Sequence, residues 1–179
     1  MRILIVFGST EGHTEHLARF AGQCLGAAGH QATVAPAADA PAPEGEDAVI
    51  VAASLHAGRY QPAVVDYVRG HAAALSARRS AFLAVSLSAA GHDHDDWAGL
   101  EQCVARLEEE TGWTPAAVHH AAGAFTFSRY NFLTRQLMKH IARKRGLDLD
   151  PRRDHDLTDY EALRRFVLGF AGSATVKAA

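Results

Sequence analysis

Ile3-Leu4-Ile5-Val6-Phe7-Gly8-Ser9-Thr10-Glu11-Gly12-His13-Thr14 is the stretch that decides the fold of this chain. Its first five residues form an unbroken apolar run rich in β-branched side chains, which is typical of a strand buried on both faces. Apolar residues then recur at helical spacing from Leu17 to Leu25, and Gly29 offers a stop. The stretch therefore predicts a buried strand, a polar loop and a helix in direct succession.

The rest of the chain repeats this alternation of strand and helix. Short apolar runs predict strands at 32–34, 47–53, 80–87 and within 116–127. Helical spacing predicts helices over 64–75, over 97–107 behind a cap at Asp95 or Asp96, and over 163–170 behind a capping box at 158–161. The alternation predicts an α/β fold with a parallel sheet, which the segment from Ser128 to His155 interrupts.

Composition narrows the class of protein. The chain has 179 residues, 48% of them hydrophobic, which predicts one compact domain over residues 1–179 and excludes wholesale disorder. Two cysteines, Cys24 and Cys103, are too few for a disulfide scaffold and suit a reducing cytoplasm. With 18 basic against 20 acidic residues, a nucleic-acid binder is not expected. No stretch approaches the roughly 20 apolar residues of a membrane span.

The loop Gly8–Thr14 carries the strongest functional signal. Hydroxyls at Ser9, Thr10 and Thr14 and the free N–H groups of the following helix predict a nest for an anion. The loop holds no Lys or Arg, and it lacks both the Gly-Lys-Ser/Thr ending of a P-loop and the three-glycine spacing of a dinucleotide loop. This combination favours a phosphate monoester held by hydroxyls and amides. The alternative is an ordinary capped loop between a strand and a helix.

The residues from Ile5 to Glu15 resemble the FMN-phosphate signature of the flavodoxin family. The resemblance implies a three-layer sandwich: a five-stranded parallel sheet in the order 2-1-3-4-5, helices on both faces, and FMN at the carboxyl ends of the strands. It also implies that the isoalloxazine lies between loops 54–60 and 86–92, with Gly58 letting the backbone approach the flavin N5 edge. The implied FMN-binding residues are Ser9, Thr10, Glu11, Gly12, His13, Thr14, Ser54, Leu55, Gly58, Ser86, Leu87 and Gly91.

Further segments are similar to the menaquinone-dependent protoporphyrinogen dehydrogenase branch of that superfamily. They are Ala52–Leu55 with Gly58–Tyr60, Ser80–Leu87, Ala122–Phe125 with Ser128–Tyr130, and Leu157–Glu161. This resemblance implies an FMN enzyme that dehydrogenates protoporphyrinogen IX in haem synthesis and passes electrons to a quinone. It implies substrate-side roles for Arg59, Tyr60 and Arg129. The chain departs from the branch at His56 and Ala57, where an Arg and an aromatic residue are common, and in the acidic loop 92–96.

The insertion from Ser128 to His155 is strongly basic. Between Arg129 and Arg145 it has six Lys or Arg and no acid, which leaves a formal charge of −8 on the rest of a chain whose total is −2. A helical apolar stripe runs along it, formed by Tyr130, Leu133, Leu137 and Ile141 with Met138 adjacent. A basic amphipathic helix suits an anionic membrane surface, where a lipid-soluble quinone is met, so we expect peripheral contact with the inner face of the cell membrane. The alternatives are a stripe packed on the sheet edge and a basic patch that binds tetrapyrrole propionates.

Other features give weaker predictions. His92 and His94 with Asp95 and Asp96 have ligand types that suit zinc or copper, but no second cluster completes a site, so a polar helix entry and no metal are expected. Two other functions stay open, namely a flavodoxin-type FMN electron carrier that docks a redox protein and an FMN quinone reductase. The oligomeric state also stays open, a homo-oligomer included.

Overall fold

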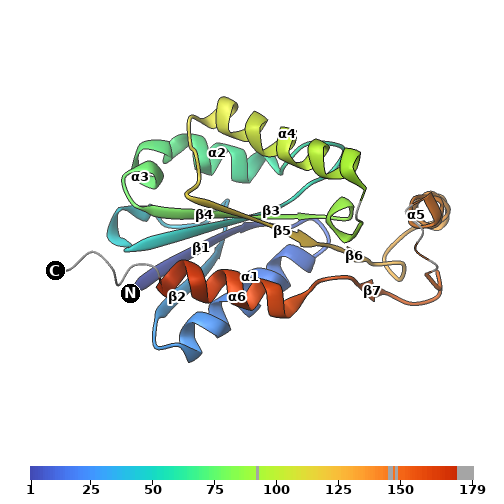
Figure 1. Cartoon of the computed structure of the whole chain (residues 1–179), viewed down its shortest axis with the longest axis horizontal. Helices are drawn as coiled ribbons and strands as arrows, with labels where there is room; N and C mark the ends of the chain where they lie inside the picture. The colour runs from blue at the N-terminus through green and yellow to red at the C-terminus, as the bar shows by residue number, and fades with distance from the viewer. Residues whose placement is uncertain (92, 145–146, 148, 173–179) are drawn as a thin grey trace.

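The computed structural model describes residues 1–91, 93–144, 147 and 149–172. Its centre is a five-stranded parallel sheet in the order β2-β1-β3-β4-β5 (Figure 1). The strands are β1 (Arg2–Gly8), β2 (Gln31–Pro36), β3 (Ala48–Ser54), β4 (Arg79–Ser86) and β5 (Ala117–Ala122). The predicted α/β class and strand order are confirmed.

Helices cover both faces of this sheet and make the fold three-layered (Figure 1). One face carries α1 (His13–Ala27) and α6 (Tyr160–Gly172). The other face carries α2 (Pro62–Gly70), α3 (Ala72–Ser76) and α4 (His94–Thr111). Single 3-10 turns, η1 (Pro43–Gly45) and η2 (Ser88–Ala90), lie in the connections.

β1 shows why a continuous apolar run becomes a central strand. Ile3, Ile5 and Phe7 pack with α1 and α6, whereas Leu4 and Val6 pack on the opposite face. All five are at most 6% exposed, because successive side chains of a strand point to opposite faces and helices cover both. β1 pairs in parallel with β2 on one side and β3 on the other. The loop after β1 therefore opens near the middle of the carboxyl edge of the sheet.

The helix expected over 64–75 is divided into α2 and α3. The backbone at His71 (φ −120°, ψ 15°) leaves the helical region, and its N–H donates to the carbonyls of Tyr67 and Val68. The apolar spacing across the break is kept, since Val64, Val68 and Leu75 are all fully buried. A pattern of apolar residues alone does not reveal such a break.

Two predicted helix caps are wrong by one to three residues. α4 is capped by Asp93, whose carboxylate accepts the Asp95 N–H over 2.8 Å, and not by Asp95 or Asp96. α6 is capped by Asp159, whose carboxylate accepts a backbone N–H of the first turn over 2.9 Å. The hydroxyl of Thr158, expected to cap α6, donates instead to a carbonyl at the end of β5.

The chain leaves the main sheet after β5. The predicted strand within 116–127 keeps only residues 117–122 in that sheet, and the short β6 (Ala124–Phe125) pairs antiparallel with β7 (His155–Asp156). Between β6 and β7 lies α5 (Phe132–Lys144), which projects beyond the carboxyl end of the sheet (Figure 1). A small separate cluster holds it there, formed by Phe125, Phe127, Tyr130 and Ala142.

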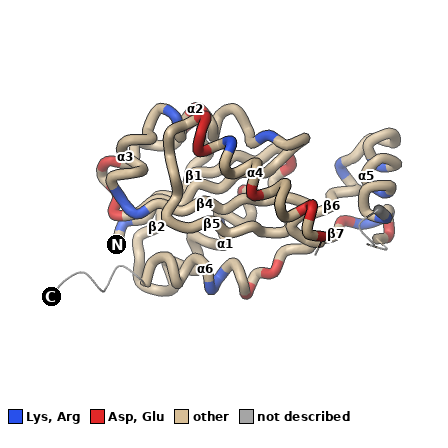
Figure 2. The backbone as a smooth tube through the Cα atoms, turned by 45° about the horizontal axis from the view of Figure 1, so that its top comes forward, with Lys and Arg blue, Asp and Glu red and all other residues tan. Residues whose placement is uncertain are grey.

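The apolar stripe expected on α5 is divided between two sides of the helix. Met138 and Ile141 face the molecule and line a cavity. Leu133 and Leu137 are 78% and 57% exposed, and the neighbouring Phe132 is 72% exposed. Packing of the whole stripe on the sheet edge is therefore ruled out. Lys and Arg lie along the same helix (Figure 2). No helix within the described ranges is long and apolar enough to cross a membrane.

Candidate functional site

The loop between β1 and α1 leaves amide groups free for a ligand. Gly12 precedes α1 with a left-handed backbone (φ 89°), which favours glycine, and no side chain caps the helix. The Gly12 N–H donates to the Ser9 hydroxyl over 3.0 Å. The N–H groups of His13, Thr14 and Glu15 donate to no other described residue. The positive end of this 15-residue helix is thus open to an anion.

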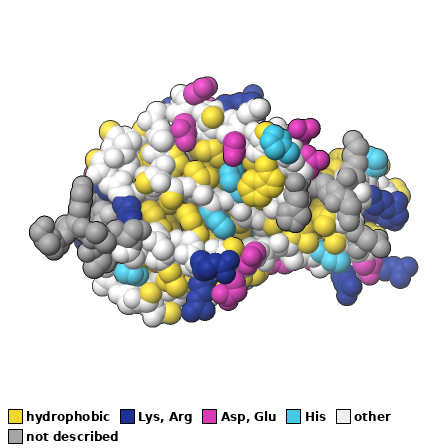
Figure 3. Space-filling view, viewed as in Figure 1, with side chains coloured by type: hydrophobic (Ala, Val, Ile, Leu, Met, Phe, Trp, Pro, Cys, Tyr) yellow, Lys and Arg dark blue, Asp and Glu magenta, His cyan; other side chains and the backbone are white. Residues whose placement is uncertain are grey.

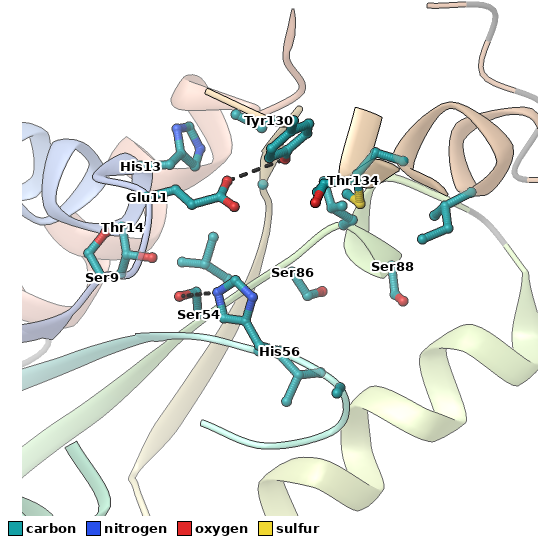
Figure 4. Close-up of a pocket in the computed structure, with 18 of the residues that line it drawn as sticks. Ser9, Glu11, His13, Thr14, Ser54, His56, Ser86, Ser88, Tyr130 and Thr134 are labelled. Atoms are coloured by element: carbon teal, nitrogen blue, oxygen red, sulfur yellow. Dashed lines mark hydrogen bonds between the residues drawn. The ribbon is translucent and has the colours of Figure 1, made fainter. Parts of the chain in front are cut away.

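A cavity of about 560 Å³ opens beside this loop (Figure 4). Its walls come from the loop after β1, the loops after β3 and β4, and the insertion that contains α5. A volume of this size is typical of sites for small molecules and cofactors. Most of the expected cofactor residues line it: Ser9, Glu11, His13, Thr14, Ser54, Leu55, Gly58, Ser86 and Leu87.

The loop after β3 turns tightly at the cavity. Residues 56–59 form a hydrogen-bonded turn with positive φ at Ala57 (48°) and Gly58 (76°), a conformation that favours glycine. The Gly58 carbonyl accepts the Cys103 thiol (3.7 Å) and the Arg106 guanidinium (3.3 Å) of α4. Neither α4 residue lines the cavity, so α4 supports this turn from outside it.

Gln61 joins the first two loops of the site, although nothing in the sequence singled it out. Its Oε1 accepts the Ser54 N–H over 3.2 Å, and its Nε2 donates to the hydroxyls of Ser54 and Thr10, the latter over 3.3 Å. His56 Nε2 lies 3.1 Å from the Ser54 hydroxyl (Figure 4). The hydroxyl of Thr10, a residue expected at the phosphate, accepts this bond from Gln61, and Thr10 does not line the cavity.

The loop after β4 contributes Ser86, Leu87 and Ser88 to the cavity. The Ser86 hydroxyl accepts the Ala89 N–H over 3.2 Å and so stabilises the turn of η2. Gly91 lies outside the cavity lining, and its carbonyl accepts the Trp97 indole N–H over 2.9 Å. Gly91 therefore anchors the start of α4.

The insertion supplies a wall of the cavity that was not expected from the sequence. This wall consists of Tyr130, Thr134, Met138 and Ile141. Burial raises the pKa of the Tyr130 phenol, which therefore stays protonated at neutral pH. The last three residues follow one another at spacings of four and three, on a different side of α5 from Leu133 and Leu137. This spacing along one side of the helix is the sequence signal that could have predicted the wall.

The residues expected on the substrate side, Arg59, Tyr60 and Arg129, do not line the cavity. Arg59 is exposed at a second, smaller cavity beside α4. Tyr60 is 7% exposed and packs edge-on against Phe82 with ring centres 5.0 Å apart. Its hydroxyl has no partner among the described residues, and burial raises its pKa. This position gives no support for contact between Tyr60 and a substrate. Arg129 lies against the loop between β1 and α1, where its guanidinium donates to the Glu11 carbonyl.

His13 is fixed at the start of α1 by the segment before α6. Its Nε2 lies 3.0 Å from the Thr158 hydroxyl, whose own proton goes to the Ala122 carbonyl, so His13 Nε2 is the donor. Burial lowers the pKa of His13, opposed by the Asp156 carboxylate at 3.7 Å. His13 is therefore neutral at neutral pH, and an anion in the neighbouring loop would favour its charged form.

The loop with His92 and His94, for which a polar helix entry and no metal were expected, is only partly described, because His92 lies outside the described residues. Within the described part of the chain, no three His, Cys, Asp or Glu side chains group as a metal ion requires.

The donors present fit a flavin that carries a phosphate. The open amides at the start of α1 and the hydroxyls of Ser9 and Thr14 suit the phosphate. Leu55, Leu87 and the inner side of α5 offer apolar contact for a planar ring in the adjoining cavity.

Comparison with known sequences points to two related groups. A family model described as "Flavodoxin domain" matches residues 4–151. A protoporphyrinogen IX dehydrogenase (quinone) of Leishmania major is 34% identical over 123 residues, which are 69% of this chain and 53% of the relative. The chain therefore spans about half the length of that relative. A protein of the same name from Escherichia coli K12 is 29% identical over 168 residues, 93% of this chain and 92% of the relative.

Solved structures agree on the fold. An archaeal flavodoxin superposes with a TM-score of 0.57 at 14% identity, covering 97% of this chain and 98% of its own. A Streptococcus pneumoniae flavodoxin superposes with a TM-score of 0.59 at 17% identity, covering 97% of this chain and 99% of its own. The family model, the strand order and the open loop before α1 agree, and the chain belongs to the flavodoxin family, whose cofactor is FMN.

Proposed function

We propose that this chain is an FMN-dependent oxidoreductase that dehydrogenates protoporphyrinogen IX to protoporphyrin IX, with a quinone as electron acceptor, in haem biosynthesis. In this proposal one flavodoxin-like domain over residues 1–179 carries the catalytic insertion. The relative from Escherichia coli, matched over nearly its whole length, bears the name of this activity and supports the assignment.

The observation that carries the proposal is the wall that the insertion adds to the cavity. Tyr130, Met138 and Ile141 face the same space as the loops after β3 and β4. An electron carrier needs only an accessible flavin edge, whereas an enzyme needs an enclosed space in which an apolar substrate lies beside the flavin. The inner side of α5 supplies one wall of such a space.

Each part of the site has a distinct task in the proposed reaction. Bound FMN supplies the two-electron chemistry. The Ser9 and Thr14 hydroxyls and the amides of α1 bind its phosphate, and the turn at Gly58 sets the backbone beside its ring. The inner side of α5 excludes water and orients the tetrapyrrole. Arg59 and Arg129 lie outside the cavity lining, and they are the proposed partners for propionates that extend beyond the cavity.

The test is anaerobic reduction of the FMN-loaded protein by protoporphyrinogen IX, followed by reoxidation with menaquinone. We expect bleaching of the flavin absorbance in the first step and its recovery in the second, with protoporphyrin fluorescence appearing alongside. If the flavin stays oxidised with this substrate but accepts electrons from a reductase, the chain is an electron carrier and the proposal fails.

We also propose that the outer side of α5 contacts an anionic membrane surface, where a quinone is met. Phe132, Leu133 and Leu137 are exposed there, and Lys139 and Arg143 are on the same helix. Apolar and basic side chains lie close together at the end of the molecule that carries α5 (Figure 3). This combination is typical of helices that lie in a membrane interface.

Liposome co-sedimentation tests this contact. We expect the wild type to sediment with vesicles that contain phosphatidylglycerol and not with neutral ones. A Lys139→Glu/Arg143→Glu variant should lose binding, while Arg164→Glu/Arg165→Glu on α6 serves as the matched control and should keep it. Equal sedimentation of both variants, or no sedimentation of the wild type, would remove the membrane contact and leave the enzymatic proposal untouched.

A further inference from the structure

Glu11 stands out because it is an acid in a loop that is open to an anion. Its carboxylate is not left free beside that anion site. Its Oε2 accepts the Thr126 hydroxyl over 2.6 Å. The same oxygen accepts the Tyr130 phenol over 3.3 Å, which is the contact drawn in Figure 4. Its carbonyl accepts the Arg129 guanidinium over 2.7 Å. Three donors from one short segment, more than a hundred residues away in sequence, thus converge on Glu11.

That segment leads directly into α5. Residues 126–130 form a turn in which the Arg129 N–H donates to the Thr126 carbonyl over 2.9 Å. Arg135, in the first turn of α5, donates to the carbonyls of Phe127 (3.0 Å) and Tyr130 (3.5 Å). The turn held by Glu11 and the start of α5 therefore form one hydrogen-bonded unit.

The returning end of the insertion reaches the same loop. His13, two residues after Glu11, donates to Thr158 and lies 3.7 Å from Asp156 of β7. Asp154, just before β7, accepts the N–H and the hydroxyl of Ser128 over 2.7 and 2.6 Å. Both ends of the insertion are thus attached to the residues that precede or begin α1.

We propose that Glu11 is a positioning residue, through which a phosphate bound at the start of α1 holds the wall that α5 contributes to the cavity. A phosphate on the loop amides restricts the backbone at Glu11, because the loop then has one conformation that satisfies the anion. The restriction passes through the Glu11 carboxylate and carbonyl to the turn 126–130 and so to α5. Linkage makes the effect reciprocal, so that a fixed α5 favours phosphate binding.

This inference rests on the FMN site but not on the tetrapyrrole chemistry, so the two fail separately. It predicts that the phosphate of FMN, rather than its ring, orders α5. Riboflavin, which has the same ring without the phosphate, is the matched ligand.

Hydrogen–deuterium exchange measured by mass spectrometry tests the prediction. Peptides covering residues 126–144 are compared in the free protein, with FMN and with riboflavin, each ligand at a concentration that saturates its absorbance change. We expect FMN to slow exchange in these peptides by about tenfold, a factor typical of coupled sites. Riboflavin should slow it far less. Equal protection by both ligands would overturn the proposal, since the ring would then order α5.

Variants separate the role of Glu11 from general stability. Glu11→Ala should bind FMN more weakly, because linkage makes the coupling reciprocal, and at an FMN concentration that saturates the variant the FMN-dependent protection of 126–144 should disappear. Glu15→Ala, an acid in the first turn of α1 whose carboxylate pairs only with Arg19 among the described residues, is the control and should keep it. Thr126→Val removes a donor from the other side of the contact, so a defect of the loop itself cannot account for the same loss. Protection retained in both Glu11→Ala and Thr126→Val would refute the proposal.

Discussion

The glycines at the two ends of α1 predict opposite effects of one substitution. Gly12 has φ 89°, and a Cβ there would lie 3.4 Å from Arg129 Nη1. Gly26 lies in the last turn of the helix, where a Cβ would meet nothing within 4 Å. A side chain at positive φ costs about 1–2 kcal/mol, whereas Ala in place of a helical Gly gains roughly 0.5–1 kcal/mol. Gly12→Ala should therefore lower the free energy of unfolding, and Gly26→Ala should raise it.

The expected gap between the two variants is roughly 1.5–3 kcal/mol, from the sum of these terms. Urea unfolding followed by tryptophan fluorescence, without flavin and at one pH, measures this gap. The gap is the difference between the two midpoints multiplied by the m value that the variants share. The reasoning is refuted if both variants shift the midpoint in the same direction, or if Gly12→Ala unfolds at the wild-type midpoint. The second outcome would mean that the backbone before α1 adopts another conformation.

Three further predictions concern the ligand, the substrate and pH. Ser9→Ala/Thr14→Val should weaken FMN binding by roughly 100-fold or more, since the variant removes two hydrogen bonds to a charged group and each is worth about 1.5–3 kcal/mol. Fluorescence titration with FMN and riboflavin checks this loss, and equal losses for both ligands would contradict a phosphate contact. Met138→Glu should lower kcat/KM for protoporphyrinogen IX by about tenfold or more, because it puts a charge into the apolar wall. Leu133→Glu, on the exposed side of α5, should leave kcat/KM unchanged in a vesicle-free assay. Equal kcat/KM values for the two variants would show that α5 does not line the substrate site. Burial lowers the pKa of His119 and of His120 from 6.5, so the unfolded state binds more protons and stability is lost as pH falls below that value. Between about pH 7 and about pH 5, the urea midpoint of His119→Asn/His120→Asn should therefore fall less steeply than that of the wild type. Parallel slopes would assign the loss of stability to other groups.

The central part of the site was predictable because local sequence determines it. The run from Ile3 to Phe7 needs both faces covered, and a polar loop at its end then has to open at the carboxyl edge of the sheet. Periodicity could place Leu133 and Met138 on α5, but it could not tell which side of the helix meets the body. That choice depends on where the turn 126–130 is fastened, and hence on Glu11, which is more than a hundred residues away.

The helix caps were missed for a related reason. Thr158 suits a cap by residue type, yet its hydroxyl serves the Ala122 carbonyl and His13, so the cap passes to the adjacent Asp159. Where two neighbouring residues can both cap a helix, a tertiary contact decides between them. Gln61 was missed because a single glutamine in a loop has no distinctive sequence pattern, although its half-buried amide joins Ser54 to Thr10.

The separation of charge between α5 and the remainder gives the molecule a large electric dipole. The segment 129–145 has a formal charge of +6 and the rest of the chain −8, and α5 lies at one end of the molecule (Figure 1). Near an extended anionic surface, the electric field of that surface exerts a torque on the dipole and turns α5 toward the surface before contact. A larger fraction of encounters then occurs with α5 facing the surface, which raises the association rate. Added salt shortens the range of the field and reduces this effect. The molecule would thus arrive with the exposed side of α5 already turned toward the surface.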